Sequence, residues 1–273
     1  SEMCIRDRFW TRGDVHERVN IALKEANLLE KKLEIEDLFP LDQYHARGIA
    51  ATIELADKLN FTKNSNIIDI GCGLGGPARY FSKRFNCNVY GIDITEAFIE
   101  IGNYFNKLTQ IDHQVKLLKG DGESLPYQTE FFDGAVSQHV TMNIEDREQF
   151  FNEAFRVLKK GAIFGFSEHG LGTKGSPIFP LPWADNEDMS FLKTPEYTKS
   201  VLKKIGFKNI EIISTGEKYI SGYNSLLKKG QSNEMPTLGI HVIGGDSMLK
   251  RSKNSMRSII ENRTYPFEII CNK

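Results

Sequence analysis

Short apolar runs alternate with longer amphipathic segments along most of the 273-residue chain. A run such as Asn66–Ile70 is short and almost uniformly apolar, which is typical of a buried parallel strand. The segments between such runs carry apolar residues at helical spacing among charged ones, which predicts amphipathic helices. The predicted strands are 66–70, 88–92, 115–119, 134–137, 162–167, 209–214 and 266–271. The predicted helices are 14–33, 43–59, 77–85, 96–109, 147–158 and 194–205, with Pro40 closing the first helical region.

This alternation of strands and helices predicts an α/β fold: a doubly wound, mostly parallel, seven-stranded sheet covered on both faces. Residues 1–50 are expected to form a helical N-terminal extension or lid, and residues 51–273 the main domain. The stretch 216–263 interrupts the pattern before the last strand and is long enough for two helices. We expect it to cap the sheet.

The amino-acid composition limits the class of protein to which the chain can belong. With 40% hydrophobic residues and a net charge of -1, the chain suits a soluble domain without a nucleic-acid partner. No apolar run is long enough for membrane insertion, and the N-terminus lacks a signal-peptide core and does not begin with Met. We therefore expect an incomplete or altered N-terminal end. Cysteines without a CxxC pair predict reduced thiols and a cytoplasmic location: Cys4, Cys72, Cys87 and Cys271.

A glycine-rich loop follows the first predicted strand, with the sequence Asp69-Ile70-Gly71-Cys72-Gly73-Leu74-Gly75-Gly76. Glycines allow a sharp turn and a close approach of a ligand, and the helix that follows offers free N–H groups. Gly71, Gly73 and Gly76 satisfy the dinucleotide pattern GxGxxG. Gly71, Gly73 and Gly75 satisfy GxGxG, so the loop alone leaves both interpretations open.

Three acidic residues accompany this loop. Asp69 precedes it, Asp93 ends the second predicted strand, and Asp121 follows the third. Carboxylates at one sheet edge repel a pyrophosphate but suit a ligand with a sulfonium, an ammonium and ribose hydroxyls. S-adenosylmethionine has these groups.

From about Leu55 to Ser214 the chain resembles the class I S-adenosylmethionine-dependent methyltransferases, in particular the branch that methylates quinones, tocopherol and methylglycines. The resemblance implies a Rossmann-like methyltransferase fold and S-adenosylmethionine as methyl donor, with S-adenosylhomocysteine as product. It places Asp69 near the methionine part, Asp93 at the ribose and Asp121 by adenine. The implied cofactor-binding residues are Asp69, Gly71, Gly73, Gly75, Asp93, Ile94, Asp121, Gly122 and Gln138.

Two histidines follow the fourth and fifth predicted strands, at the edge where such sheets bind ligands. His139 is the first candidate for a general base or an acceptor-binding group, and His169 is a second acceptor-binding candidate. The alternative for each is a loop histidine bonded to backbone. Upstream, Tyr44 and His45 are candidates to close the pocket and assist catalysis, and Arg47 is a candidate partner for a carboxylate.

A proline-rich apolar segment, 177–184, supplies candidate walls for the acceptor pocket. Because prolines restrict the backbone, Phe179 and Trp183 are expected to bind the acceptor, with plain packing as the alternative. A zinc site formed by His139, Glu168 and His169 is not expected, since no HExxH or paired-cysteine spacing is present.

The expected function is methylation of a small-molecule amine, of the sarcosine or dimethylglycine kind. The alternative within the same class is O- or C-methylation of a phenolic or quinol-like acceptor, favoured by the apolar segment around Trp183. Outside this class, GxGxxG leaves open a nicotinamide-dependent oxidoreductase, and a structural His139 would leave open a non-catalytic cofactor-binding subunit. A homodimer is also left open.

Overall fold

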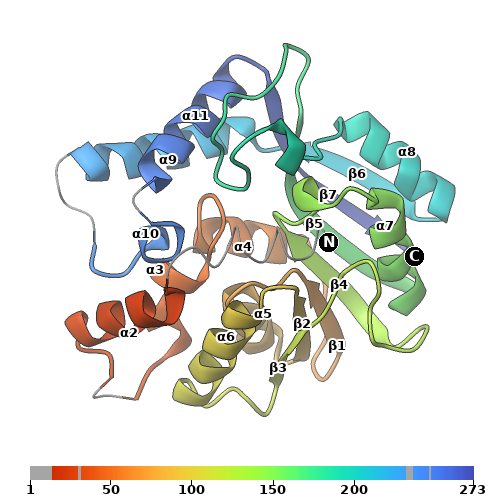
Figure 1. The fold of residues 1–273 in the computed structure, drawn as a ribbon. Helices are drawn as coiled ribbons and strands as arrows, with labels where there is room; N and C mark the ends of the chain where they lie inside the picture. Colours follow the sequence, from red (N-terminus) through yellow and green to blue (C-terminus); the bar gives the residue numbers. More distant parts are fainter. Residues whose placement is uncertain (1–13, 30–31, 232–235, 246) are drawn as a thin grey trace.

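A seven-stranded sheet forms the centre of the computed structural model, which describes residues 14–29, 32–231, 236–245 and 247–273 (Figure 1). The strand order is β3-β2-β1-β4-β5-β7-β6. Strands β1 to β5 pair in parallel, while β7 pairs antiparallel with both β5 and β6. The prediction of a doubly wound, mostly parallel sheet is therefore confirmed. The strands are β1 (Asn66–Ile70), β2 (Asn88–Asp93), β3 (Val115–Lys119), β4 (Phe132–Gln138), β5 (Leu158–Leu171), β6 (Lys208–Ser214) and β7 (Thr264–Asn272).

Helices flank the sheet and extend from one of its edges (Figure 1). The helices within the alternating part are α4 (Ile49–Ala56), α5 (Gly76–Phe85), α6 (Glu96–Leu108), α7 (Arg147–Val157) and α8 (Pro195–Ile205), with short 3-10 turns at Thr141–Asn143 and Glu187–Met189. Those of the N-terminal part and of the segment before β7 are α2 (Val15–Glu25), α3 (Ile35–Asp42), α9 (Gly216–Gln231), α10 (Ile240–Gly244) and α11 (Met248–Ile260).

Four predicted boundaries were wrong. The first helix ends at Glu25 rather than continuing to residue 33, because a residue in the left-handed conformation, Asn27, follows it. Pro40 does not close the region but lies inside α3, near the end of an eight-residue helix. The predicted helix 43–59 begins only at Ile49, after a turn in which Arg47 has φ +71°. Strand β5 extends on both sides of the predicted range, because β7 pairs with it as far as Leu171 and β4 pairs with Leu158 at its start.

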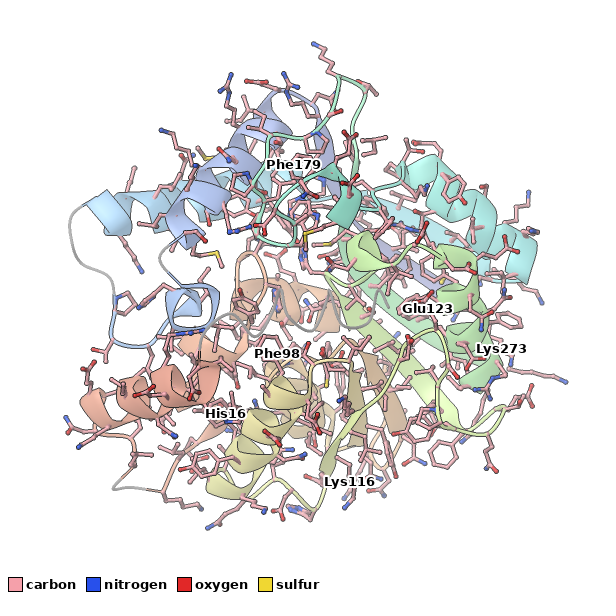
Figure 2. All side chains as sticks on the ribbon, in the orientation of Figure 1. His16, Phe98, Lys116, Glu123, Phe179 and Lys273 are labelled. Atoms are coloured by element: carbon pink, nitrogen blue, oxygen red, sulfur yellow. The ribbon has the colours of Figure 1, made fainter. Side chains whose placement is uncertain are left out.

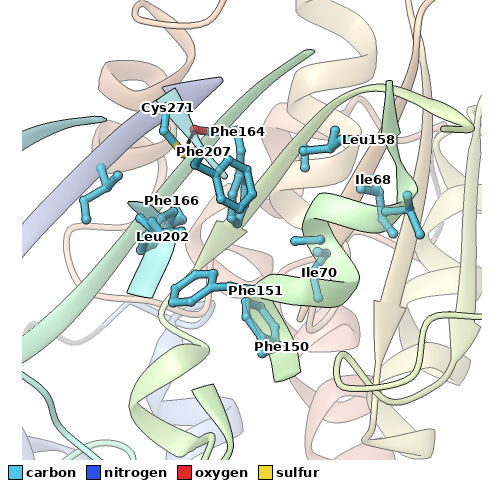
Figure 3. Close-up of a cluster of buried hydrophobic side chains, with 14 of the residues drawn as sticks. Ile68, Ile70, Phe150, Phe151, Leu158, Phe164, Phe166, Leu202, Phe207 and Cys271 are labelled. Atoms are coloured by element: carbon cyan, nitrogen blue, oxygen red, sulfur yellow. Dashed lines mark hydrogen bonds between the residues drawn. The ribbon is translucent and has the colours of Figure 1, made fainter. Parts of the chain in front are cut away.

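The largest hydrophobic cluster packs α7 and α8 against the sheet (Figure 3). Phe150 and Phe151 of α7 are fully buried there with Phe164 and Phe166 of β5. The rings of Phe151 and Phe166 have centroids 5.2 Å apart, and aromatic contacts of this kind add to the stabilisation from burial alone. This packing fixes β4 and β5, whose carboxyl ends carry His139 and His169.

The segment before β7 contributes α9, α10 and α11 among the described residues, rather than two helices. Figure 1 shows α9 and α11 side by side beyond the end of the sheet, with α10 next to the N-terminal helices. Arg18 of α2 donates from Nε to the carbonyl of Val242 (2.8 Å) and from Nη2 to that of Ile243 (3.1 Å). The N-terminal part and this insertion therefore contact one another directly.

Two expectations about the whole chain concern its cysteines and membranes. Cys72, Cys87 and Cys271 are buried free thiols, and Cys4 and the expected altered N-terminus lie outside the described residues. In the part of the chain that the structure describes, no helix has both the length and the apolarity needed to span a bilayer.

Candidate active site

The glycine loop between β1 and α5 bends through left-handed backbone conformations. Gly71, Gly73 and Gly75 have φ values of +81°, +52° and +76°, which side-chain-bearing residues adopt only with strain. A Cβ atom at Gly71 would lie 2.1 Å from Val140, and one at Gly75 would lie 2.6 Å from Leu117. A Cβ at Gly73 would contact nothing within 4 Å. Gly73 therefore faces open space, whereas Gly71 and Gly75 pack so closely against other residues that neither has room for a side chain.

Asp93, at the end of β2, binds this loop through its carboxylate. Its Oδ2 accepts a hydrogen bond from Gly73 N (2.8 Å) and its Oδ1 accepts one from Thr95 N (2.9 Å). Asp121 follows β3, and its Oδ1 accepts from Glu123 N (2.9 Å) in a tight turn. Both carboxylates are only partly buried, so each can still bond to a ligand.

A pocket with about 750 Å³ of unfilled space lies at this edge of the sheet, and we call it the strand-end pocket. It brings together most of the residues predicted to bind the cofactor. The predicted residues that line it are Tyr44, Gly71, Gly73, Asp93, Ile94, Asp121, Gly122, Gln138 and His139. The other described lining residues are Ile70, Ile92, Thr95, Phe98, Gly120, Val140, Asn143 and Ile144. Gly75 is not among them.

Asp69 also lies outside the lining, although it is close behind it. Its side chain is 1% exposed, and its Oδ2 has no hydrogen-bond partner among the described residues. Burial, together with the nearby charge of Asp93, raises the pKa of Asp69 to about 8. The sheet edge therefore presents two carboxylates to the pocket, with the carboxyl group of Asp69 buried beneath them.

His139 joins the strand-end pocket to a second one. It follows β4 in a left-handed conformation (φ +59°), and its backbone N donates to the carbonyl of Ser167 (2.8 Å). Such a conformation is costly for a non-glycine residue and is often found at functional sites. The second pocket, which we call the ring-lined pocket, has about 520 Å³ of unfilled space. Its described lining residues are Tyr44, His45, Ala46, His139, Met142, His169, Pro182, Trp183, Tyr223, Ile240, Met248 and Ser252.

The imidazole of His139 is held by a tyrosine and a second histidine. Its Nε2 lies 2.6 Å from the hydroxyl of Tyr219, a residue of α9 that is 1% exposed. The ring of His45 stacks on that of His139 at 5.7 Å, with an angle of 7° between the planes. Burial lowers the pKa of His139 well below its ordinary value, so the ring is neutral at physiological pH.

His45 is itself fixed by partners on both nitrogens. Its Nε2 lies 3.1 Å from the hydroxyl of Thr52, and its Nδ1 lies 3.3 Å from the carbonyl of Ala46. Burial lowers its pKa to about 4. Thr52 also lies 3.2 Å from Oε1 of Gln138, which ties the N-terminal segment to the end of β4.

Arg47 does not line either pocket. Its guanidinium forms an ion pair with Glu54, and its Cζ lies 5.9 Å from the centre of the Tyr219 ring. The predicted partner for a ligand carboxylate is thus engaged with an acid of the protein.

His169 and Trp183 stack on one another in the ring-lined pocket, with ring centres 4.6 Å apart. Neither nitrogen of His169 has a hydrogen-bond partner among the described residues, although the side chain is only 1% exposed. Phe179 lies outside the pocket and packs on the cluster that contains Trp183 and Leu181. Figure 2 places Phe179 near α11, and Phe98 in the first turn of α6.

Two tyrosines of α9 belong to this site but were missed by the sequence analysis. Tyr219 contacts His139, and Tyr223 lines the ring-lined pocket and accepts a hydrogen bond from Ser255 of α11 (3.0 Å). Their spacing of four residues on an amphipathic helix was the available signal.

Glu168, considered above as a metal ligand, points elsewhere. It forms a buried ion pair with Arg147 at 2.8 Å. Within the described ranges, no group of three or more His, Cys, Asp or Glu side chains is arranged to hold a metal ion.

Comparison with known proteins finds a similarity to methyltransferases in the central part of the chain. Residues 68–166 match the family model described as a methyltransferase domain. Over 114 residues the chain is 32% identical to the sterol 24-C-methyltransferase of Candida albicans, a match that covers 42% of this chain and 30% of that protein. It is 29% identical over 175 residues to the sarcosine/dimethylglycine N-methyltransferase of Halorhodospira halochloris, covering 64% of this chain and 62% of that one. The chain thus spans less than two thirds of either relative.

Among solved structures, the fold is similar to a phosphoethanolamine N-methyltransferase 2 of Haemonchus contortus, in complex with phosphomonomethylethanolamine and S-adenosylhomocysteine. The TM-score is 0.78 at 18% identity, covering 98% of this chain and 60% of that one. This likeness concerns the fold. Residues 68–166 are thus similar in sequence to methyltransferase domains, and the chain is similar in fold to a solved methyltransferase.

Proposed function

We propose that the protein transfers a methyl group from S-adenosylmethionine, bound in the strand-end pocket, to a nitrogen of a small-molecule amine in the ring-lined pocket. One observation carries this proposal: the two pockets share Tyr44 and His139 in their linings. Methyl transfer is a direct displacement that needs donor and acceptor aligned and water excluded. Adjoining pockets of this kind meet that need.

The strand-end pocket has features that fit this donor. Gly73 leaves open space beside the loop, Asp93 and Asp121 offer carboxylate oxygens, and Asp69 has an unpaired buried oxygen beneath them. S-adenosylmethionine, when bound, supplies a methyl group on a positively charged sulfur. Asp93 would accept bonds from the ribose and Asp121 from adenine, and the negative charge of both disfavours a diphosphate ligand. This argues against the nicotinamide-dependent alternative.

His139 is the residue that we propose as general base. Since its Nε2 is bonded to Tyr219, it can exchange a proton with an acceptor only through Nδ1. In this role the neutral ring carries its proton on Nε2, which donates a hydrogen bond to the tyrosine oxygen, while Nδ1 accepts and keeps the proton that leaves the acceptor. His45 would support this ring by stacking, and Tyr44 would close the junction between the pockets.

Methylation of nitrogen is supported by the similarity to a relative named as an N-methyltransferase. The second candidate is methylation of a phenolic or other apolar acceptor, which the similarity to sterol 24-C-methyltransferases and the aromatic lining of the pocket favour. Transfer of label from methyl-labelled S-adenosylmethionine to a panel of small amines and phenols tests both. We expect product with an amine, and a loss of turnover in His139→Ala that exceeds its loss of cofactor affinity. Equal losses would contradict a role of His139 in the reaction.

We further propose that residues 1–50 are an extension that closes the site together with the insertion 216–263. Arg18 supports this, since it forms hydrogen bonds that connect α2 to α10.

A cytoplasmic location is supported by the buried free thiols. The net charge of -1 supports a small molecule rather than nucleic acid as partner. A homodimer remains a prediction, which light scattering after size-exclusion chromatography tests.

A further inference from the structure

The ring-lined pocket contains no charged side chain among its described lining residues. Half of these residues carry aromatic rings: Tyr44, His45, His139, His169, Trp183 and Tyr223. The histidines among them are neutral because burial lowers the pKa of each, to about 4 for His45 and about 3 for His169. A bound molecule would therefore meet polar but uncharged groups.

The two arginines that directly adjoin lining residues in sequence are both in ion pairs, and Arg251, which precedes Ser252, pairs with Asp185. Arg47 follows Ala46 of the lining, but its guanidinium is paired with Glu54 behind the Tyr219 ring. Lys218 also contacts Glu54, at 2.6 Å. An anionic group placed in the ring-lined pocket would lose its hydration and gain no ionic partner from these residues, which is strongly unfavourable.

His169 offers a positive feature of recognition. Its side chain is almost completely buried, it lines the pocket, and both of its nitrogens lack a partner in the described chain. Buried polar groups are almost always hydrogen-bonded in native proteins. Two ring nitrogens without a partner at a pocket wall therefore point to a ligand that hydrogen-bonds to them. The stack with Trp183 fixes the plane in which these nitrogens can bond.

We propose that the ring-lined pocket selects an acceptor that carries no carboxylate or phosphate and that forms a hydrogen bond to His169. This rests on the proposed function and narrows its acceptor to amines or phenols with an otherwise uncharged skeleton. It separates this chain from relatives named for sarcosine and dimethylglycine, whose acceptors carry a carboxylate.

Calorimetry with matched acceptors tests the proposal on the chain loaded with S-adenosylhomocysteine and on the free chain. One pair is dimethylethanolamine and dimethylglycine, and the other is tyramine and tyrosine. In each pair of which at least one member binds, we expect the member without a carboxylate to bind at least tenfold more tightly than the member with one. Equal or tighter binding of the carboxylate member would overturn the proposal, and so would a failure of all four to bind.

Two variants sharpen the result. His169→Phe keeps a ring against Trp183 but removes both nitrogens, so it should weaken acceptor binding about tenfold while S-adenosylhomocysteine affinity stays the same. Ile240→Arg adds a cation at a partly exposed lining position and should shift the preference toward the carboxylate members, whereas Ile240→Gln should not. Unchanged acceptor affinity in His169→Phe, together with an unchanged preference in Ile240→Arg, would overturn the proposal. Failure of S-adenosylhomocysteine itself to bind would instead refute the proposed function, and the free-chain titrations would still test the pocket.

Discussion

Replacing Asp93 tests how the glycine loop and the ribose site depend on one carboxylate. Asp93→Ala removes the acceptor of two backbone bonds, from Gly73 N and Thr95 N, together with any bond to a ribose hydroxyl. A hydrogen bond to a charged group contributes about 1.5–3 kcal/mol, less where water can replace it. Because Asp93 is partly exposed, we expect S-adenosylhomocysteine to bind about 1–3 kcal/mol more weakly, roughly a 5- to 150-fold rise in Kd.

Isothermal calorimetry measures this change, and a second ligand pair separates the two roles of the residue. If Asp93 binds the ribose, the wild-type protein prefers adenosine to 2′,3′-dideoxyadenosine and Asp93→Ala loses that preference. If it only holds the loop, both ligands weaken equally. Glu96→Gln, which removes an exposed acid paired with Lys119, is the matched control and should leave Kd unchanged. An unchanged affinity in Asp93→Ala would refute the assignment.

The remaining predictions concern the base, a buried acid and the core. Tyr219→Phe removes the partner of His139 Nε2 and should lower kcat about tenfold with the affinity for S-adenosylhomocysteine unchanged; a loss of affinity equal to the loss of kcat would indicate a purely structural role. The folded-state pKa of Asp69, about 8, is above its usual 3.8, so wild-type stability falls as pH rises between these values. Denaturation should show Asp69→Asn gaining on the wild type from pH 5 to pH 8, and a constant difference would contradict the raised pKa. Phe164→Ala should cost about 3–5 kcal/mol of unfolding free energy, whereas Leu118→Ala, at an exposed position, should change it by under about 0.5 kcal/mol; similar losses in both would refute the placement of the core.

The strands could be predicted from sequence because those of a parallel sheet are buried on both faces and therefore apolar throughout. Helix α3 was missed because Pro40 was taken as a helix breaker, whereas a proline near the end of a short helix disrupts few hydrogen bonds. A strand places successive side chains on opposite faces, so the position of Asp69 near the glycine motif did not determine whether it reaches the pocket.

The ring-lined pocket was only partly predictable for a different reason. Its histidines follow strand ends, a position that sequence can identify. Tyr219 lies 80 residues from His139 and reaches it only because α9 folds back over the site. Such a long-range contact leaves no local pattern, and the pairing of Arg47 with Glu54 is likewise visible only in three dimensions.

Comparing the binding of two adenosine-containing ligands to the purified chain tests the central assignment most directly. Calorimetric titration with S-adenosylhomocysteine should give saturable binding to one site per chain, and titration with NAD should give none, since Asp93 and Asp121 face the pocket with negative charge. Saturable binding of NAD without binding of S-adenosylhomocysteine would contradict the account.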